Sequence, residues 1–270
     1  MSGFRPWFRG VLILIWLVWG FLMILIPIPL MSFLGPRKKA SGILWIQQRW
    51  CQRACRLLNV RITVSGEIHS KAGLWVANHI SWLDILVIGA IRPGFFVAKH
   101  EVSNWPALGW LARGIGTLFI RRGDPLHSAE VQTQMIHHLR TAKPLVIFPE
   151  GTTSDGTRVL RFHSRLFRPA ETVGVMVQPL GLQYEPPVKD VVPFIGEDAF
   201  VPHLLRLLQV KVIEVKVRAH GLSPEGASAG EMARLSRSSI QSGIQMQHES
   251  SAPKRSSNLL ETLDTNSAIT

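Results

Sequence analysis

The segment GLWVANHISWLD, residues 73–84, decides how this chain is organised. Its first five residues form an apolar run that is typical of a buried strand, and a histidine and an aspartate follow, five positions apart. An imidazole can accept a proton from a hydroxyl near neutral pH, and a neighbouring carboxylate can fix its tautomer and stabilise the imidazolium. The spacing therefore predicts His79 as a general base and Asp84 as the residue that orients it.

A second interpretation of the same residues needs no chemistry. Ser81 and Asp84 precede the apolar run 85–88 with the spacing of a capping box, in which side chains of the first helical turn satisfy free backbone N–H groups. The segment then predicts no more than a helix that begins directly after the strand.

Two further strand-like runs also end in polar residues. The run 145–148 leads into PEGTTS, residues 149–154, and the run 117–120 leads into Arg121 and Arg122. Functional side chains concentrate in loops at the carboxyl ends of strands, where a rigid sheet positions them. We therefore expect the three strand ends to meet in one site.

Strand-like and helix-like segments alternate along the middle of the chain. Strands are expected at 60–65, 73–77, 94–98, 117–120, 145–148, 173–182 and 210–218, and helices at 81–90, 105–114 and 126–142. This alternation predicts an α/β fold in which helices cover a mixed central sheet. Residues 41–220 are expected to form that domain, and residues 221–270 a low-complexity, disordered tail with a short helix at 231–239.

The N-terminal segment, residues 1–40, is expected to anchor the chain to a membrane. It is uncharged and almost wholly apolar over 11–26 and stays apolar, past two prolines, as far as residue 34. A helix over 11–26 is about 24 Å long, shorter than the roughly 30 Å hydrocarbon core. A bent transmembrane anchor and a helix pair half-immersed in one leaflet both fit. A cleavable signal peptide fits less well, because no small-x-small site follows the run.

Basic residues outnumber acidic ones, giving a net charge of +12 and a pI near 10.6. The cluster 37–39, followed by Arg49, Arg53 and Arg56, outweighs the two arginines that precede the apolar run. The positive-inside rule therefore predicts an inner-membrane protein whose domain faces the cytoplasm. Membrane lipids with anionic headgroups are the expected partners of this charge. No nucleic acid is expected, because the chain has no helix-turn-helix, RNP or zinc-finger spacing.

The two cysteines, Cys51 and Cys55, lie one helical turn apart and share an apolar register with Ile46, Trp50 and Leu58. This pattern predicts buried helix residues rather than a disulfide, which is rare in a cytoplasmic domain. The two thiols form no four-ligand metal set with other residues, so we expect no metal site.

Four short blocks, taken together, resemble a known family. They are N-H-x-x-x-x-D at 78–84, G-x-x-F-I-x-R at 116–122, F-P-E-G-T-x-S at 148–154 and V-x-P at 177–179. Their order is that of the glycerolipid acyltransferases, in particular bacterial lysophosphatidic acid acyltransferases. Each block alone is weak, and the resemblance covers roughly residues 40–220.

The resemblance implies a role for several individual residues. His79 and Asp84 correspond to the family's catalytic dyad, and Arg122 to a residue that binds the glycerophosphate. Lys99 falls where the family often has a lysine near the phosphate, and both cations suit a phosphate chemically. Arg121 departs from the pattern, because the residue before the family arginine is often acidic, so either arginine is a candidate to face the phosphate.

The resemblance also places Glu150 and Gly151 at the glycerophosphate. A carboxylate cannot attract a phosphate, so the expected role of Glu150 is to hold an arginine or a substrate hydroxyl, while Gly151 offers an N–H to an anion. Thr152 is expected either to contact the substrate or to cap the loop. Pro179 is implied as part of the site wall, although the residues around it predict a buried strand.

The implied function is transfer of a fatty acyl group from a thioester to the sn-2 hydroxyl of lysophosphatidic acid, giving phosphatidic acid. The donor is acyl-coenzyme A or acyl carrier protein, and no cofactor is expected. Three alternatives stay open: another lyso-lipid acceptor such as lyso-ornithine lipid, a lipid hydrolase in which His79 activates water, and a non-catalytic lipid-binding membrane protein.

Overall fold

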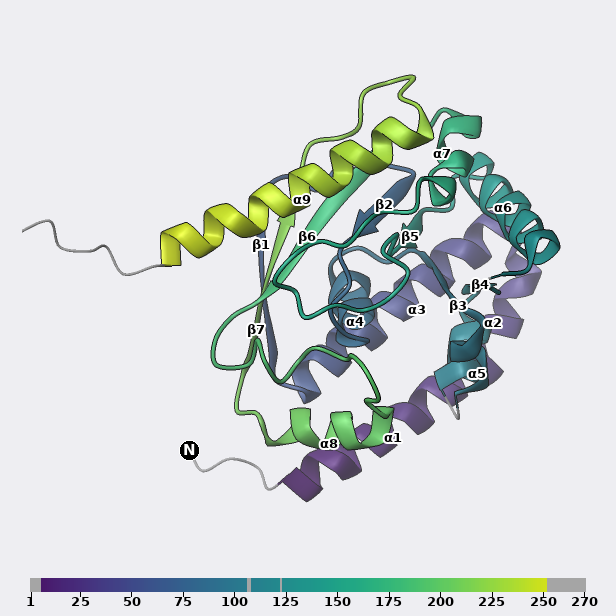
Figure 1. The fold of residues 1–270 in the computed structure, drawn as a ribbon. Coiled ribbons are helices and arrows are strands. Elements are labelled where there is room, and N and C mark those ends of the chain that lie inside the picture. Colours follow the sequence, from purple (N-terminus) through teal and green to yellow (C-terminus); the bar gives the residue numbers. More distant parts are fainter. Residues whose placement is uncertain (1–5, 106–107, 122, 252–270) are drawn as a thin grey trace, which may run out of the picture.

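The computed structural model describes residues 6–105, 108–121 and 123–251, and seven strands in it form one sheet (Figure 1). Their spatial order is β1-β7-β6-β2-β5-β3-β4. The β6–β7 pair is antiparallel and the other pairs are parallel, so the sheet is mixed, as predicted. The strands are β1 (Val60–Ser65), β2 (Leu74–Ala77), β3 (Phe95–Lys99), β4 (Leu118–Ile120), β5 (Leu145–Ile147), β6 (Val177–Tyr184) and β7 (Ile213–Ala219).

Helices cover both faces of this sheet. Side chains alternate along β2, so that Leu74 and Val76 enter one core while Trp75 and Ala77 enter the other, and all four are fully buried. The Trp75 face is covered by α3 (Pro36–Leu57), α4 (Leu83–Ile91) and α8 (Phe200–Gln209). The Leu74 face is covered by α6 (Pro125–Arg140), α7 (Arg168–Val173) and α9 (Ala229–Ser251) (Figure 1). The predicted helix-covered α/β fold is therefore confirmed.

Every predicted strand overlaps an observed strand, and the differences lie at the ends. The largest is at β6, predicted from residue 173 but observed from Val177, because Val173 ends α7 and Gly174 turns the chain with a positive φ of 73°. The predicted helices correspond to α4, α5 (Leu108–Gly114) and α6. Helices α7 and α8 were not predicted, since α7 has only six residues and α8 leads directly into the β7 region.

The C-terminal helix is much longer than predicted. Instead of a short helix at 231–239, α9 runs over 23 residues and packs against β6 and α7. Its buried positions are Ala229, Met232, Ala233, Ser236, Ile240, Gly243 and Ile244, which recur every three or four residues. Because several of these side chains are small, the apolar periodicity is hard to recognise in the sequence. The same small side chains let the helix approach the sheet closely. Residues 252–270, the rest of the predicted disordered tail, lie outside the described residues.

The N-terminal helix α1 (Pro6–Leu25) lies along the domain (Figure 1). Its Trp16 ring stacks on Trp50 of α3 with centroids 3.8 Å apart, and Arg9 Nη1 donates to two carbonyls at the end of α8, 3.0 and 3.2 Å away. The short helix α2 (Pro27–Leu30) and a 3₁₀ turn (Met31–Leu34) lead into α3, which crosses the predicted domain boundary at residue 40. Within the described chain, Phe8–Leu30 is the one stretch long and apolar enough to cross a membrane.

The two cysteines are buried and free on α3, which confirms that prediction. Burial raises the pKa of the Cys55 thiol to about 12 and that of Cys51 further, so both stay protonated. Cys51 packs tightly against α4, because a Cβ added at Gly89 would lie 2.7 Å from its Sγ. These thiols therefore serve the packing of α3 on α4.

Candidate active site

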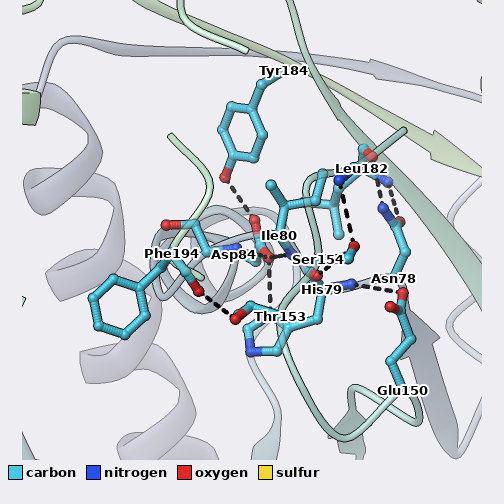
Figure 2. Close-up of polar contacts among 12 residues, drawn as sticks. Asn78, His79, Ile80, Asp84, Glu150, Thr153, Ser154, Leu182, Tyr184 and Phe194 are labelled. Carbon is cyan, nitrogen blue, oxygen red and sulfur yellow. Dashed lines mark hydrogen bonds and ion pairs between the residues drawn. The ribbon is translucent and has the colours of Figure 1, made fainter. Parts of the chain in front are cut away.

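An asparagine ties the loop after β2 to the neighbouring strand β6. Asn78 Nδ2 donates to the carbonyl of Leu182 at 2.9 Å, and Asn78 Oδ1 accepts from the Leu182 N–H at 2.7 Å (Figure 2). The side-chain amide thus extends the contact between β2 and β6 beyond the end of β2. This pairing fixes the direction in which the next residue, His79, leaves the sheet.

The two residues predicted as a catalytic pair are in direct contact. His79 Nδ1 lies 2.9 Å from Asp84 Oδ2 (Figure 2). Because a carboxylate accepts this hydrogen bond, Nδ1 carries the proton and Nε2 is the basic nitrogen. The imidazole also stacks on Phe148, with ring centroids 4.0 Å apart and planes inclined by 17°. The ring is therefore held in one plane and one tautomer, while its side chain keeps 17% exposure.

The carboxylate of Asp84 is fully buried in the first turn of α4. Its Oδ2 also accepts the backbone N–H groups of Ile80, at 2.6 Å, and Ser81, at 2.8 Å. The half of the predicted capping box in which the Asp84 side chain accepts the Ser81 N–H is thus present. The other half is absent, because Ser81 Oγ is buried and has no hydrogen-bond partner among the described residues. The capping and catalytic interpretations are not alternatives, because the same carboxylate begins the helix and orients His79.

Tyr184 completes the surroundings of Asp84, and sequence reasoning missed it. The Tyr184 hydroxyl donates to Asp84 Oδ1 at 2.7 Å (Figure 2). Burial, followed by the nearby charge of Asp84, raises the pKa of Tyr184 well above its usual value, so the phenol remains a donor. Tyr184 is the only tyrosine in the chain, a feature that could have drawn attention to it.

Glu150 lies behind the site rather than in it. It is 4% exposed, and its Oε1 accepts the backbone N–H of His79 at 3.1 Å (Figure 2). Burial raises the pKa of Glu150 to about 7, against the opposing effect of that hydrogen bond. The carboxyl group therefore holds the backbone of His79.

Gly151 has a conformational role. Its φ of 72° is in the left-handed region that glycine adopts without strain, and its N–H donates to the carbonyl of Phe148 at 3.0 Å. The expectation that this N–H is offered to an anion is therefore wrong, because the tight turn uses it.

The loop after β5 is bonded to the loop after β2. The Ser154 N–H donates to the carbonyl of His79 at 2.8 Å, and the Thr153 hydroxyl donates to the carbonyl of Phe194 (Figure 2). The Phe194 N–H in turn donates to the carbonyl of Ile80 at 2.9 Å. The two strand ends thus meet in one hydrogen-bonded unit, as β2 and β5 are neighbours in the sheet.

A cleft of about 210 Å³ opens beside the His79 ring. Of the predicted site residues, Lys99, Gly151 and Thr152 line it together with His79. Arg165 adds a second cation to the lining. The cleft thus combines a base with positive charge.

Neither Arg121 nor Pro179 lines this cleft. Arg122 lies outside the described residues. Its neighbour Arg121 is exposed, with Nη2 3.2 Å from His100 Nε2. Pro179 is buried within β6, in register with Val76 of β2. Its position agrees with the buried strand expected from the residues around it.

An apolar chamber of about 150 Å³ continues from the cleft toward α1. The two cavities share lining residues, among them Trp82, Phe96 and Trp105. The far end of the chamber is lined by Ile13 and Leu17 of α1, together with residues of α3 and α5. The His79 ring therefore lies where a cleft with two cationic side chains meets an apolar chamber.

The chain resembles several characterised proteins. Residues 60–183 match the family model described as Acyltransferase. A lyso-ornithine lipid O-acyltransferase from Pseudomonas aeruginosa is 40% identical over 194 residues, covering 71% of this chain and 75% of that protein. Another from Rhizobium meliloti is 34% identical, covering 72% and 71%. A 1-acyl-sn-glycerol-3-phosphate acyltransferase from Neisseria gonorrhoeae is 32% identical, covering 55% and 59%.

A solved structure shares the fold. The 1-acyl-sn-glycerophosphate acyltransferase from Thermotoga maritima superposes with a TM-score of 0.60 and 20% identity, over 89% of this chain and 98% of that one. The family match spans the loops and the helix start that carry His79, Asp84 and Glu150. Together with 40% identity over three quarters of a curated relative, it shows that this chain belongs to the glycerolipid acyltransferase family.

Proposed function

We propose that this chain transfers a fatty acyl group from a thioester to the hydroxyl of a lyso-lipid, with His79 as the general base. The observation that carries the proposal is the position of the His79–Asp84 pair where a cationic cleft meets an apolar chamber. The cationic cleft suits a charged headgroup, and the apolar chamber suits an acyl chain.

The reaction follows from the tautomer of His79. Nε2 takes the proton of the acceptor hydroxyl as its oxygen attacks the thioester carbonyl, and Asp84 stabilises the imidazolium at Nδ1. The tetrahedral intermediate collapses, the carbon–sulfur bond breaks, and the leaving thiolate takes the proton back from Nε2. Thr152 lines the cleft, and its backbone N–H has no acceptor among the described residues, so we assign it to the developing oxyanion.

The apolar chamber is the proposed seat of the acyl chain. Its lining is almost wholly apolar and includes Trp82, Phe96 and Leu111. Burying a methylene group contributes about 0.8 kcal/mol, so a chain of several carbons gains most of its binding energy there. The donor is acyl-coenzyme A or acyl carrier protein, and the chemistry assigned to His79 needs no metal or cofactor.

Lyso-ornithine lipid is the acceptor that we place first. Four curated relatives with 34–40% identity carry that activity in their names. Three relatives named for 1-acyl-sn-glycerol-3-phosphate are 30–32% identical. Lysophosphatidic acid, which sequence analysis favoured, is the second candidate. Lys99 and Arg165 in the cleft favour an acceptor with an anionic group, and the carboxylate of ornithine and the phosphate of lysophosphatidic acid both meet that requirement.

The proposed location is the cytoplasmic face of the inner membrane. Support comes from the apolar segment Phe8–Leu30, the basic residues of α3 that follow it, and the cytoplasmic origin of the thioester donors. The contacts of Trp16 and Arg9 with the domain favour a helix that lies in one leaflet over one that crosses the bilayer.

The test is thiol release from acyl-coenzyme A by the full chain in lipid vesicles, with lyso-ornithine lipid, lysophosphatidic acid or no acceptor. We expect acceptor-dependent release that is highest with lyso-ornithine lipid and is lost in His79→Ala. A higher kcat/KM with lysophosphatidic acid would reverse the order of acceptors and leave the chemistry in place. Fatty acid release without an acceptor would indicate a hydrolase, and no turnover with any acceptor or donor would refute the proposal.

A further inference from the structure

A surface groove separate from the catalytic cleft lies between α1 and α3. It has a volume of about 350 Å³. It is lined by Leu12, Ile15, Trp16 and Trp19 of α1 and by Arg53, Arg56 and Leu57 of α3. Among the described residues, Trp16 alone lines both this groove and the apolar chamber, so the two cavities are neighbours with different openings.

The groove has one apolar wall and one cationic wall. Leu12, Ile15 and Leu57 supply the apolar surface. The Arg53 guanidinium lies 4.4 Å above the Trp19 ring, which orients it while leaving its N–H groups available. Neither Arg53 nor Arg56 makes an ion pair with any described acid. Such a surface matches a molecule with an apolar chain and an anionic head.

The charge of this region is unusually one-sided. The first 66 residues contain no Asp or Glu, and their nine basic residues are Arg5, Arg9, Arg37, Lys38, Lys39, Arg49, Arg53, Arg56 and Arg61. This segment therefore holds +9 of the total net charge of +12. Since no described acid pairs with the groove arginines, their charge favours an anionic partner from outside the described residues.

The position of the groove points to the membrane as the source of that partner. The exposed side chains of α1 form one apolar stripe beside it, at Val11, Leu14, Ile15, Val18, Leu22 and Leu25. A helix with such a stripe rests in the acyl region of a leaflet, and tryptophans and arginines next to it lie at the headgroup level. Ile15 belongs to both the stripe and the groove, so a lipid beside α1 reaches Arg53 and Arg56 with its phosphate.

We propose that the groove binds one anionic phospholipid of the surrounding membrane. Its phosphate is held by Arg53 and Arg56, and the first part of an acyl chain lies along Leu12, Ile15 and Leu57. Guanidinium groups suit a phosphate because their N–H donors match its oxygens in pairs. The bound lipid fixes α1 against α3, and it is a structural partner rather than a substrate, since the groove does not include His79 or any other cleft residue.

The test is native mass spectrometry of the full chain in detergent, titrated with phosphatidylglycerol or phosphatidylcholine. We expect one tightly bound phosphatidylglycerol and no comparable phosphatidylcholine. Each basic residue near an anionic lipid surface contributes about fivefold, so Arg53→Gln/Arg56→Gln should weaken binding about thirtyfold. The variant Arg53→Lys/Arg56→Lys keeps both charges and should recover most of the affinity. It also separates charge loss from misfolding, which circular dichroism checks independently.

The matched control is Lys38→Gln/Arg49→Gln, which removes two exposed charges from α3 outside the groove. It should bind phosphatidylglycerol within about threefold of the wild type, since a surface charge acts weakly beyond its immediate neighbourhood. Equal losses in the two double variants, equal binding of the two lipids, or displacement by inorganic phosphate at constant ionic strength would overturn the proposal. His79→Ala should bind like the wild type, so this result does not depend on the proposed reaction.

Discussion

Replacing Tyr184 by phenylalanine removes one oxygen atom from the surroundings of the buried Asp84 carboxylate. Asp84 Oδ2 has three donors, namely His79 Nδ1 and the N–H groups of Ile80 and Ser81, whereas Oδ1 has the Tyr184 hydroxyl, 2.7 Å away. The aromatic ring stays in place in the variant, so the packing of β6 is preserved. The change therefore isolates one hydrogen bond to a buried charge.

The expected cost follows from the burial of Asp84, whose side chain has no exposure to water. A hydrogen bond to a charged group contributes about 1.5–3 kcal/mol, and a buried acceptor that loses its donor is not compensated by solvent. We expect Tyr184→Phe to lower the free energy of unfolding by about 2 kcal/mol. Because the raised pKa of Tyr184 keeps the phenol protonated, the loss should be the same from neutral to mildly alkaline pH.

The catalytic effect should appear in kcat rather than in KM. Tyr184 does not line the cleft, so acceptor binding should change by less than about twofold. A loosened Asp84 holds the His79 ring less firmly, and a loss of about 1.4 kcal/mol in the transition state corresponds to a tenfold lower kcat. Steady-state thiol release measures both parameters, and urea unfolding measures stability.

A double-mutant cycle with Asp84→Asn provides the control. Hydrogen bonds to ionised groups are roughly twice as strong as those between neutral groups, so Tyr184→Phe should cost only about half as much when Asp84→Asn is already present. An unfolding free energy within about 0.5 kcal/mol of the wild type would refute the reasoning, since surface-like substitutions fall in that range. So would an equal cost in both backgrounds, because the tyrosine would then not act through the charge of Asp84.

Three further changes test other parts of the site. Burial raises the pKa of Glu150 to about 7 in the folded chain from an ordinary value of 4.5, so its contribution to stability is full below pH 4.5 and is lost as the pH rises through 7. Glu150→Gln should therefore remove a pH dependence of about 3 kcal/mol from the free energy of unfolding. Urea unfolding between pH 4.5 and 7 measures it. Gly151→Ala places a side chain at a φ of 72° and should cost about 1–2 kcal/mol of stability, with a reduced kcat. Ala112→Leu adds three carbons to the chamber wall and should shorten the preferred acyl chain by about three carbons, seen in competition between acyl-coenzyme A donors.

Local patterns were sufficient to predict the strands of the sheet and the contact between His79 and Asp84. The strands show either an apolar run or an alternation of apolar and polar residues, and the His79–Asp84 spacing lies within a single loop and helix start, so no long-range information was needed. Lys99 and Thr152 were placed by family resemblance, and the structure puts both beside His79 in the cleft. Their roles in binding stay predictions.

The features that sequence missed depend on contacts between distant segments. Tyr184 meets Asp84 across 100 residues, and that contact follows from the position of β6 next to β2, which no local pattern encodes. The use of the Gly151 N–H depends on how tightly the loop turns after β5. The helix α9 was underestimated because its buried face is made largely of small residues, whose value lies in close packing on β6 rather than in hydrophobicity.

Helix α4, which carries Asp84, is also tied to the apolar N-terminal helix α1 through α3. In the first turn of α4, the Asp84 carboxylate accepts the backbone N–H of Ser81. At its last turn, carbonyls without a partner in the helix accept hydrogen bonds from the side-chain amides of Gln48 and Gln52 on α3, at 3.1–3.2 Å. Helix α3 in turn carries Trp50, on which Trp16 of α1 stacks. The base, the wall of the apolar chamber and the apolar N-terminal helix are thus joined through one pair of helices on one face of the sheet. Under the proposed function, an acyl chain in the chamber lies between His79 and α1. The same proposal implies that the orientation of α1 in the leaflet sets the direction from which the lipid reaches His79.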